Sequence, residues 1–315
     1  MRFPSWWLSI FAWACVAQAS LTESPYRDLI EWGHLQGLVA RSSADEVRLT
    51  NRWTALWFKS ESKRILFGGV EVRLCDPVVL KQGRLRISQR DIEKTLNPLL
   101  EPPQRSGKAI RTVVVNAGHG GKDPGNMEGR KEEKVFTLAL ATEVKRQLEH
   151  SGIRVIMVRG TDNYVEREER AAIANRGAGD LYVSLHFNTT AGAADGKVQG
   201  LETYCLTPVG AASSNDTRSH GGGRFPGNAQ DRLNLVFAQM VHRAILDATE
   251  LTDRGVRRAR FKELTLVHMP GILVEGGYMN HPHDSRLIYS PAGRAKLAEG
   301  IVDGILAYKR LLERG

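Results

Sequence analysis

From residue 110 onward, short apolar runs rich in β-branched residues alternate with longer helical patterns. The apolar runs, typical of buried strands, occupy residues 112–115, 155–158, 181–185 and 272–274. Between and after them, helical patterns cover about 165–175, 230–251 and 292–312, and apolar side chains four residues apart mark a further helix at Phe136, Leu140, Val144 and Leu148. This alternation predicts an α/β fold with a mostly parallel, twisted sheet flanked by helices.

The residues before this region have a different pattern. Short segments of alternating polar and apolar residues cover about 36–88, and a helical pattern follows over 90–100. A polar stretch that starts with Pro102 and Pro103 then leads into the first strong strand, as a linker would. We therefore predict that the chain is organised as a small β-rich N-terminal module, a linker and an α/β domain, over 20–101, 102–109 and 110–315.

Residues 1–19 are expected to be a signal peptide. Arg2 precedes an apolar run over 6–16, and Ala17-Gln18-Ala19 is a small-x-small cleavage signal. The run is shorter than the roughly 20 residues that a membrane-spanning helix needs, and no later segment is long and apolar enough to be a transmembrane segment. We expect export to the periplasm or the extracellular cell envelope, with a lipid anchor at Cys15 as the less favoured alternative.

Charge and cysteine content narrow the partners and the redox chemistry. The formal net charge of +9 favours an anionic partner, but the basic residues are scattered apart from a short cluster at Arg257, Arg258 and Arg260. A nucleic-acid partner is therefore not expected. Beyond the leader only Cys75 and Cys205 remain, which is too few for a disulfide framework. We interpret them as core thiols, with one inter-domain disulfide as the alternative.

Four polar residues are expected at one edge of the predicted sheet. His119, His186 and Glu275 follow three of the apolar runs, and Glu133 lies where the first helix begins, at the same end of the sheet. Each alone has an ordinary explanation, since His186 could be a core histidine and Glu133 a first-turn helix acid. Together they predict a metal site, because a catalytic zinc takes about three N or O ligands and keeps a position for water.

Several motifs around these residues occur in an order that resembles one known family. They are Gly118-His119-Gly120-Gly121-Lys122-Asp123-Pro124-Gly125, Glu133-Lys134, Thr161-Asp162, Arg170, Ala174-Asn175, Ser184-Leu185-His186-Phe187-Asn188, Arg254-Gly255-Val256 and Val274-Glu275-Gly276-Gly277-Tyr278-Met279-Asn280. On these motifs the chain from about 111 to 308 resembles the catalytic domain of the zinc-dependent N-acetylmuramoyl-L-alanine amidases. The resemblance covers nearly the whole predicted α/β domain.

The resemblance implies an enzyme that hydrolyses the amide between N-acetylmuramic acid and L-alanine in peptidoglycan. It further implies that His119, Glu133 and His186 bind one Zn²⁺ and that Glu275 is the catalytic carboxylate. Glu132, next to Glu133, leaves a one-residue ambiguity that the leucine offsets resolve in favour of Glu133. The residues expected to orient the metal ligands or to bind substrate are Asn116, Asp123, Arg170, Asn175, Asn188 and Asn280.

One departure from the family and two alternative functions stay open at this point. Asn116 stands where the family often has Asp, and a neutral amide there could weaken the orientation of a ligand. The alternatives are another zinc-dependent cell-wall peptidase, or a non-catalytic peptidoglycan-binding or activator protein.

The N-terminal module resembles small β modules of bacterial envelope enzymes, which suggests an envelope activator or anchor as its partner. The polar stretch 207–228 is expected to be a mobile loop, either at the rim of the site or elsewhere on the surface.

Overall fold

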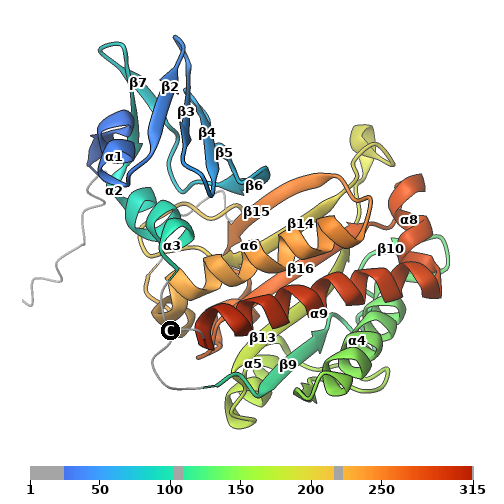
Figure 1. The fold of residues 1–315 in the computed structure, drawn as a ribbon. Coiled ribbons are helices and arrows are strands. Elements are labelled where there is room, and N and C mark those ends of the chain that lie inside the picture. The colour runs from blue at the N-terminus through green and yellow to red at the C-terminus, as the bar shows by residue number, and fades with distance from the viewer. Residues whose placement is uncertain (1–24, 103–108, 216–222, 314–315) are drawn as a thin grey trace, which may run out of the picture.

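The computed structural model describes residues 25–102, 109–215 and 223–313, and it confirms the predicted α/β architecture (Figure 1). One sheet of 11 strands runs through the molecule in the order β12-β9-β13-β16-β14-β15-β6-β5-β4-β3-β2. The predicted signal peptide over 1–19 and most of the predicted linker over 102–109 lie outside the described residues. The proposed domain boundaries therefore stay a prediction.

Six strands of the α/β region form one side of this sheet, from the edge strand β12 to β15. They are β9 (Thr112–Ala117), β12 (Arg154–Met157), β13 (Leu181–Asn188), β14 (Leu201–Leu206), β15 (Asp253–Ala259) and β16 (Gly271–Tyr278). Strands β12, β9, β13 and β16 are parallel to one another, whereas β14 pairs with β16 in the antiparallel direction. Residues after β9 and β13 therefore meet at one edge of the sheet, where β16 also passes.

Helices cover both faces of this sheet. Figure 1 shows α6 (Asp231–Ala248) and α9 (Pro291–Glu313) lying side by side over one face, with α4 (Glu133–His150) next to them. Buried side chains of these three helices share one core with β9, β13 and β16. Helices α5 (Arg167–Arg176) and α7 (Lys262–Leu266) pack on the opposite face around a second, smaller core. The short helix α8 (Pro282–Tyr289) precedes α9.

The close packing of α6 against α9 depends on two glycines. A Cβ atom added at Gly304 would lie 2.5 Å from the Cα atom of Val241, and one at Gly300 would lie 2.6 Å from the Cα atom of Ile245. Both distances are shorter than real Cβ atoms tolerate. The backbones of the two helices can approach this closely only because neither position carries a side chain.

The N-terminal residues form the predicted β-rich region with a terminal helix. Its elements are β1 (Tyr26–Asp28), α1 (Leu29–Leu35), β2 (Val39–Ser42), β3 (Glu46–Thr50), β4 (Ala55–Lys59), β5 (Arg64–Phe67), β6 (Val70–Arg73), β7 (Val79–Lys81), β8 (Arg84–Ser88), α2 (Gln89–Asp91), the π-helix η1 (Ile92–Leu96) and α3 (Asn97–Leu100). Helix α1 is not among the elements expected from the sequence. Strands β1, β8 and β7 form a separate sheet, while β2 to β6 extend the central one.

The two parts of the chain are joined through β6 and β15. Val72 pairs with Val256 across these strands, and the Glu71 backbone N–H donates to Asp253 Oδ2 at 2.7 Å. Asp253 Oδ1 in turn contacts His242 Nε2 of α6 at 2.9 Å. The N-terminal strands therefore continue the sheet of the α/β region and are held to it by a partly buried polar contact.

Cys75 and Cys205 are both buried free thiols, so the disulfide alternative is wrong in this structure. Burial raises the pKa of both thiols, which keeps them protonated.

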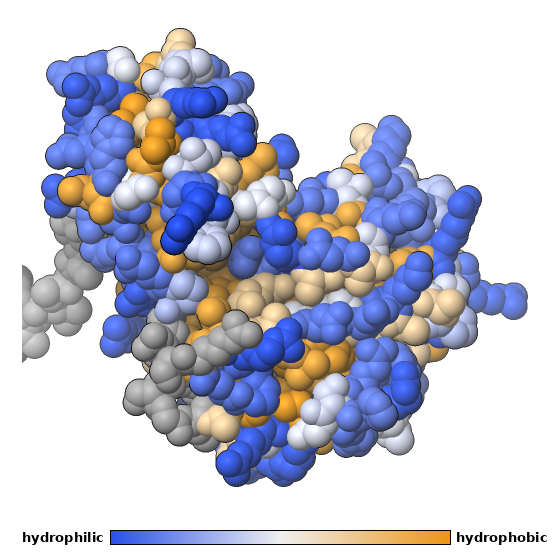
Figure 2. All heavy atoms as spheres, viewed as in Figure 1, coloured by the Kyte–Doolittle hydropathy of each residue, from blue (hydrophilic) through white to orange (hydrophobic). Residues whose placement is uncertain are grey.

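Within the described ranges, no helix has the length and apolar character needed to cross a bilayer. Figure 2 shows mostly hydrophilic residues on the viewed face, with smaller hydrophobic patches that include part of the N-terminal strands.

Candidate metal centre and catalytic cavity

A tight glycine-rich turn after β9 brings His119 to the edge of the sheet. His119 itself has φ of 61°, in the left-handed region that non-glycine residues rarely adopt. A Cβ atom at Gly118 would lie 2.3 Å from His186 Cε1, and one at Gly125 would lie 2.7 Å from Glu133 Oε2. The glycines of the sequence motif are therefore required by close approach of the backbone to His186 and Glu133.

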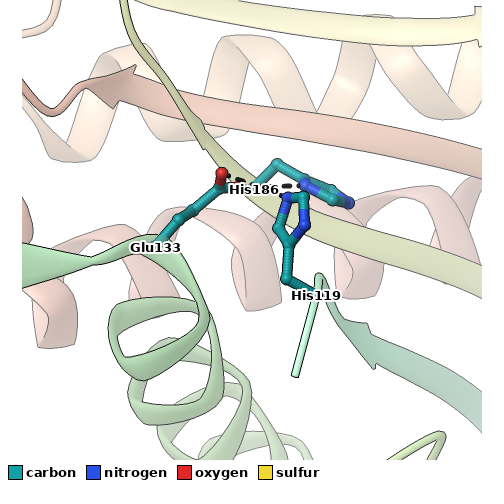
Figure 3. A group of neighbouring side chains, drawn as sticks. All are labelled: His119, Glu133 and His186. Carbon is teal, nitrogen blue, oxygen red and sulfur yellow. Dashed lines mark hydrogen bonds and ion pairs between the residues drawn. The ribbon is translucent and has the colours of Figure 1, made fainter. Parts of the chain in front are cut away.

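His119, Glu133 and His186 meet at this edge. Glu133 at the start of α4 points toward both imidazoles, with Oε2 at 3.1 Å from His119 Nε2 and Oε1 at 3.0 Å from His186 Nδ1 (Figure 3). One donor atom from each of the three lies within 4.8 Å of the other two. Glu132 instead contacts Lys134 at 3.2 Å, so the structure selects Glu133 for this cluster.

The chemistry of the cluster fits a divalent metal. Two imidazoles and one carboxylate are the ligand types of a catalytic zinc site, and Glu133 is almost completely buried. His186 Nε2 is also buried, and it has no hydrogen-bond partner among the described residues. A metal ion would compensate buried polar atoms that would otherwise be costly.

Backbone and carboxylate contacts fix the orientation of the cluster. Asp123 Oδ2 lies 2.8 Å from His119 Nδ1, and the Gly125 N–H donates to Asp123 Oδ1 at 3.1 Å. The Phe187 and Asn126 backbone N–H groups donate to the two oxygens of Glu133, at 3.1 and 2.8 Å. A carboxylate–histidine contact of this kind sets the tautomer and the ring orientation of a metal ligand.

Asn116 does not take part in this orientation. Its Nδ2 donates to Ser184 Oγ at 2.9 Å below the edge of the sheet, and it is completely buried. The expectation that a neutral amide at this position would affect the ligands therefore loses its basis, because Asp123 provides the contact to His119.

The titration of the cluster reflects its mutual contacts. Burial alone would raise the pKa of Glu133, but hydrogen bonds with His119 and His186 outweigh it and hold that pKa well below its usual range. Burial would lower the pKa of His119, but its contacts with Glu133 and Asp123 outweigh this effect and raise it. Without a metal ion, the three side chains therefore share protons and charge among themselves.

Glu275 lies beside the cluster on the neighbouring strand. In the register of β13 and β16, Glu275 is the partner of His186. Burial, with added repulsion from Glu133, Glu202 and Glu263, raises the pKa of Glu275 well above its usual range. Its Oε2 atom is buried and has no hydrogen-bond partner among the described residues. A carboxyl group in this environment holds its proton more tightly than an exposed carboxyl group does.

The cluster and Glu275 line a cavity of about 450 Å³ that also has a cationic wall. That wall carries Arg167, Arg170, Arg260 and Lys262. Arg170 is only 3% exposed, and among the described residues the one hydrogen-bond partner of its side chain is the Val165 carbonyl, which accepts from Nε at 3.0 Å. Its terminal nitrogens are therefore available to a ligand in the cavity.

Three of the residues that were expected to orient the metal ligands or to bind substrate are not part of the cavity lining. Asn175 bonds the Leu266 carbonyl and the His268 N–H, Asn280 bonds the Thr190 carbonyl, and Asn188 approaches Glu202 at 3.5 Å. These amides hold neighbouring loops in place, because turn backbone needs hydrogen-bond partners that its own sequence does not supply. We therefore do not assign them a contact with substrate.

Some residues of the site could not be identified from the sequence. Asn126 lines the cavity and donates from Nδ2 to the Phe187 carbonyl at 2.8 Å, and Arg159 binds the Ala117 and Gly118 carbonyls at 2.9 and 2.8 Å. Both side chains donate hydrogen bonds to backbone carbonyls, and the pattern of side chains in a sequence does not indicate such contacts. The one available signal is that Arg159 directly follows an apolar run.

Part of the polar stretch 207–228 borders the same cavity. Asn215 lines it, while residues 216–222 lie outside the described ranges. The expectation that this stretch reaches the rim agrees with the position of Asn215. Its mobility stays a prediction.

The family model and two related proteins that match this chain are described as N-acetylmuramoyl-L-alanine amidases. A family model described as N-acetylmuramoyl-L-alanine amidase matches residues 113–307. The amidase AmiA of Escherichia coli is 26% identical over 247 residues, which is 70% of this chain and 84% of AmiA. The sporulation-specific N-acetylmuramoyl-L-alanine amidase of Bacillus subtilis is 26% identical over 195 residues, which is 61% of this chain and 66% of that protein.

Solved structures match the same region. The amidase AmiC2 of Nostoc punctiforme is 32% identical with a TM-score of 0.53, and the match covers 65% of this chain and 99% of AmiC2. The catalytic domain of CwlV from Bacillus (Paenibacillus) polymyxa is 28% identical with a TM-score of 0.52, covering 63% of this chain and 97% of that domain. The matched part of the chain contains His119, Glu133, His186 and Glu275.

Proposed function

The chain belongs to the N-acetylmuramoyl-L-alanine amidase family, and from this premise we propose that it hydrolyses the amide between N-acetylmuramic acid and L-alanine in peptidoglycan with one zinc ion. The observation that carries the proposal is the convergence of His119, Glu133 and His186 within 4.8 Å, with Glu275 beside them in register. A ligand set without an adjacent proton carrier would fit a structural metal site. A ligand set with one fits a hydrolase.

The zinc would be held by His119, Glu133 and His186. When bound, zinc lowers the pKa of water toward about 7 and polarises a carbonyl oxygen. The protein contributes the orientation of the ligands: Asp123 fixes the ring of His119, and the backbone N–H groups of Asn126 and Phe187 fix both oxygens of Glu133.

Glu275 is assigned as the group that moves the proton. Hydrolysis adds the oxygen of water to the carbonyl carbon, breaks the C–N bond and needs a proton on the departing nitrogen of L-alanine. Glu275 takes the proton from the attacking water and delivers it to that nitrogen, so the carboxylate is regenerated in each cycle. This kind of general acid–base catalysis contributes roughly 10²- to 10⁴-fold to the rate.

The charge of the cavity fits an anionic stem peptide. Arg167, Arg170, Arg260 and Lys262 line the same cavity as the reacting groups. Peptide stems of the cell wall carry free carboxylates, and Arg binds carboxylates through paired donors. Arg170 is the strongest candidate for this contact because its buried position is fixed before substrate arrives.

The proposal is tested with Glu275→Ala in the zinc-loaded full chain acting on purified peptidoglycan. The variant is expected to keep its zinc and to lose turnover. The wild-type products should be peptides with a free N-terminal L-alanine and glycan strands with a free lactyl carboxyl group, both identified by mass spectrometry. Cleavage between two residues of the peptide would show instead a different zinc peptidase. Absence of any cleavage with bound zinc would show a binding protein.

The location of the enzyme belongs to the same proposal. We propose that residues 1–19 direct export and that the mature enzyme acts in the cell envelope, where its substrate lies. An envelope activator or anchor would contact the N-terminal module, whose exposed apolar residues include Val39 and Trp53. Mass spectrometry of the mature N-terminus tests the leader, since cleavage after Ala19 gives Ser20 as the first residue, whereas a lipid anchor leaves a modified Cys15.

A further inference from the structure

A second cavity, of about 250 Å³, lies at the joint between the N-terminal strands and the α/β region. Lys63 precedes β5 and Arg73 ends β6, and they line one side. Arg257 and Arg258 of β15 line the other side, together with Ser213 and Ser214. The cavity is separate from the catalytic one, which has His119, Glu133 and Glu275 in its lining.

The lining of this cavity carries positive charge alone. Four of its lining residues are cationic, and among the described residues that line it there is no Asp or Glu. Two nearby acids are shared with other cations: Glu71 contacts Arg64 at 2.7 Å as well as Arg73 at 2.9 Å. Glu202 likewise contacts both Arg254 and Arg257, at 2.8 and 3.2 Å. Each of these carboxylates therefore neutralises less than one full charge of the cavity wall.

Arg258 shows that the positive charge is built into the fold. It is 5% exposed, and its Nη2 donates to the Lys94 carbonyl and to Thr95 Oγ1 at 2.8 and 3.0 Å. Its Nε is buried and has no hydrogen-bond partner among the described residues. Asp91 and Asp231 offset part of its charge from outside the cavity. A buried donor without an acceptor is costly, and an anion in the cavity would remove that cost.

We propose that this cavity binds a phosphate group. Phosphate near neutral pH carries between one and two negative charges and at least three acceptor oxygens, which suits several cationic donors better than a singly charged carboxylate does. The small volume limits the ligand to inorganic phosphate or to a phosphate ester that enters head first. Both sources present the same chemistry to Lys63, Arg73, Arg257 and Arg258.

The cavity shares a wall with the catalytic site. Ser213 Oγ and Asn215 Oδ1 both accept from the Arg260 backbone N–H at 2.9 Å, and Ser214 Oγ donates to the Arg258 carbonyl at 2.7 Å. Asn215 and Arg260 line the catalytic cavity, while Ser213 and Ser214 line the phosphate cavity. Phosphate binding therefore holds the segment that forms one side of the substrate site.

The test measures binding of inorganic phosphate to the zinc-loaded full chain by isothermal titration calorimetry. Lys63→Gln and Arg73→Gln are expected to weaken binding by about tenfold each, since a hydrogen bond to a charged group contributes roughly that factor. Lys81→Gln is the matched control, because it removes the same charge from an exposed position outside the cavity. Lys63 is exposed, so its variant should fold normally even if Arg73→Gln does not.

The outcomes separate the proposal from general electrostatics. Unchanged binding in Lys63→Gln, or an equal loss in Lys81→Gln, overturns the site. Acetate binding as tightly as phosphate overturns the assignment of the ligand class. Glycerol 3-phosphate is the second arm: tighter binding than inorganic phosphate identifies a phosphate ester as the source, and weaker binding identifies the free ion. Phosphate should also raise the Tm of the wild type more than that of Lys63→Gln.

Discussion

His186 on β13 and Glu275 on β16 are partners in the register of two adjacent parallel strands. Paired residues on neighbouring parallel strands place their side chains on the same face of the sheet, so a metal ligand and the proton carrier are positioned by backbone hydrogen bonds. The rigid sheet, and no mobile loop, sets the distance between them. The loops contribute His119 and the start of α4 contributes Glu133, which close the cluster from the other side.

Replacing Asp123 tests how the cluster is oriented. Asp123→Asn should lower zinc affinity by about 10- to 100-fold, because the amide no longer provides the charged partner of His119 Nδ1. Competition with a chelator of known affinity measures the change. Asp303→Asn, at an exposed position on α9, is the control and should leave zinc affinity unchanged. Equal affinity in Asp123→Asn and wild type would contradict the orienting role of Asp123.

Zinc affinity should depend on pH through His119. The pKa of His119 in the metal-free protein is raised, so the protonated ring persists above the usual pKa of a histidine. Zinc needs the neutral ring and must displace that proton. Affinity should therefore fall as pH drops through the raised pKa of His119, and zinc binding near that pKa should release protons. Titrations in buffers of different ionisation enthalpy measure the release; a pH-independent affinity between pH 6 and 8 would rule this mechanism out.

Asp253 links acid stability to the joint between the two parts of the chain. Burial would raise its pKa, but hydrogen bonds from His242 and from the Glu71 and Gly255 N–H groups outweigh it and lower the pKa. A lowered folded-state pKa adds stability that is complete above the unfolded pKa, near 3.8, and is lost as pH falls through the folded value. Asp253→Asn should therefore reduce the free energy of unfolding by about 1–3 kcal/mol at pH 7 and by less at pH 3.

Urea unfolding of Asp253→Asn and wild type at both pH values measures this difference. Asp45→Asn is the control, because Asp45 is a half-exposed acid between β2 and β3 whose contact with Lys59 spans 3.5 Å. It should change the free energy of unfolding by less than about 1 kcal/mol at either pH. An equal loss for Asp253→Asn at both pH values would show that its charge is not the source of the stability.

Gly304 should reverse the usual effect of alanine in a helix. In an exposed helix interior, replacing Gly by Ala adds roughly 1 kcal/mol of stability. At Gly304 the new Cβ would lie 2.5 Å from the Val241 Cα, and a backbone atom cannot move aside without shifting α6. Gly304→Ala should therefore lower the free energy of unfolding by about 1–3 kcal/mol. Denaturant unfolding checks this, with Glu299→Ala on the exposed side of α9 as a control of small effect.

The sequence predicts the part of this architecture that local chemistry determines. Strands β9, β13 and β16 have apolar, β-branched cores, so both they and the polar residues after them could be located. Strand β15 could not, because Arg254, Arg257 and Arg258 look like surface residues. Glu202 pairs with Arg254 and Arg257. Arg258 donates to the Lys94 carbonyl and to Thr95 Oγ1. These contacts form only when segments that are distant in the sequence pack together.

The same limit applies to the site. His119, His186 and Glu275 could be placed because strand ends share one edge of the sheet. The roles of the other polar residues depend on turn geometry. Asp123 contacts the metal-binding residue His119, whereas Asn280 hydrogen-bonds a neighbouring loop. Motif order names both residues without saying which one faces His119.

Arg170 provides the sharpest test of how substrate is recognised. It is buried in the wall of the catalytic cavity, with its terminal nitrogens available to a carboxylate of the stem peptide. Arg170→Gln should lower kcat/KM by about 10- to 100-fold on a muropeptide with a free carboxyl group at the second residue, because a charge-assisted pair is lost. Arg167→Gln, which removes a more exposed cation of the same cavity, should have a smaller effect because solvent screens it.

A substrate with that carboxyl group amidated separates recognition from folding. Wild-type enzyme should lose activity on the amidated muropeptide, whereas Arg170→Gln should act on both substrates at similar rates. A structural defect would lower both rates in the variant and keep the wild-type preference between them. If the preference survives in Arg170→Gln, the carboxylate is bound elsewhere, and Arg260 and Lys262 on the same wall become the next residues to replace.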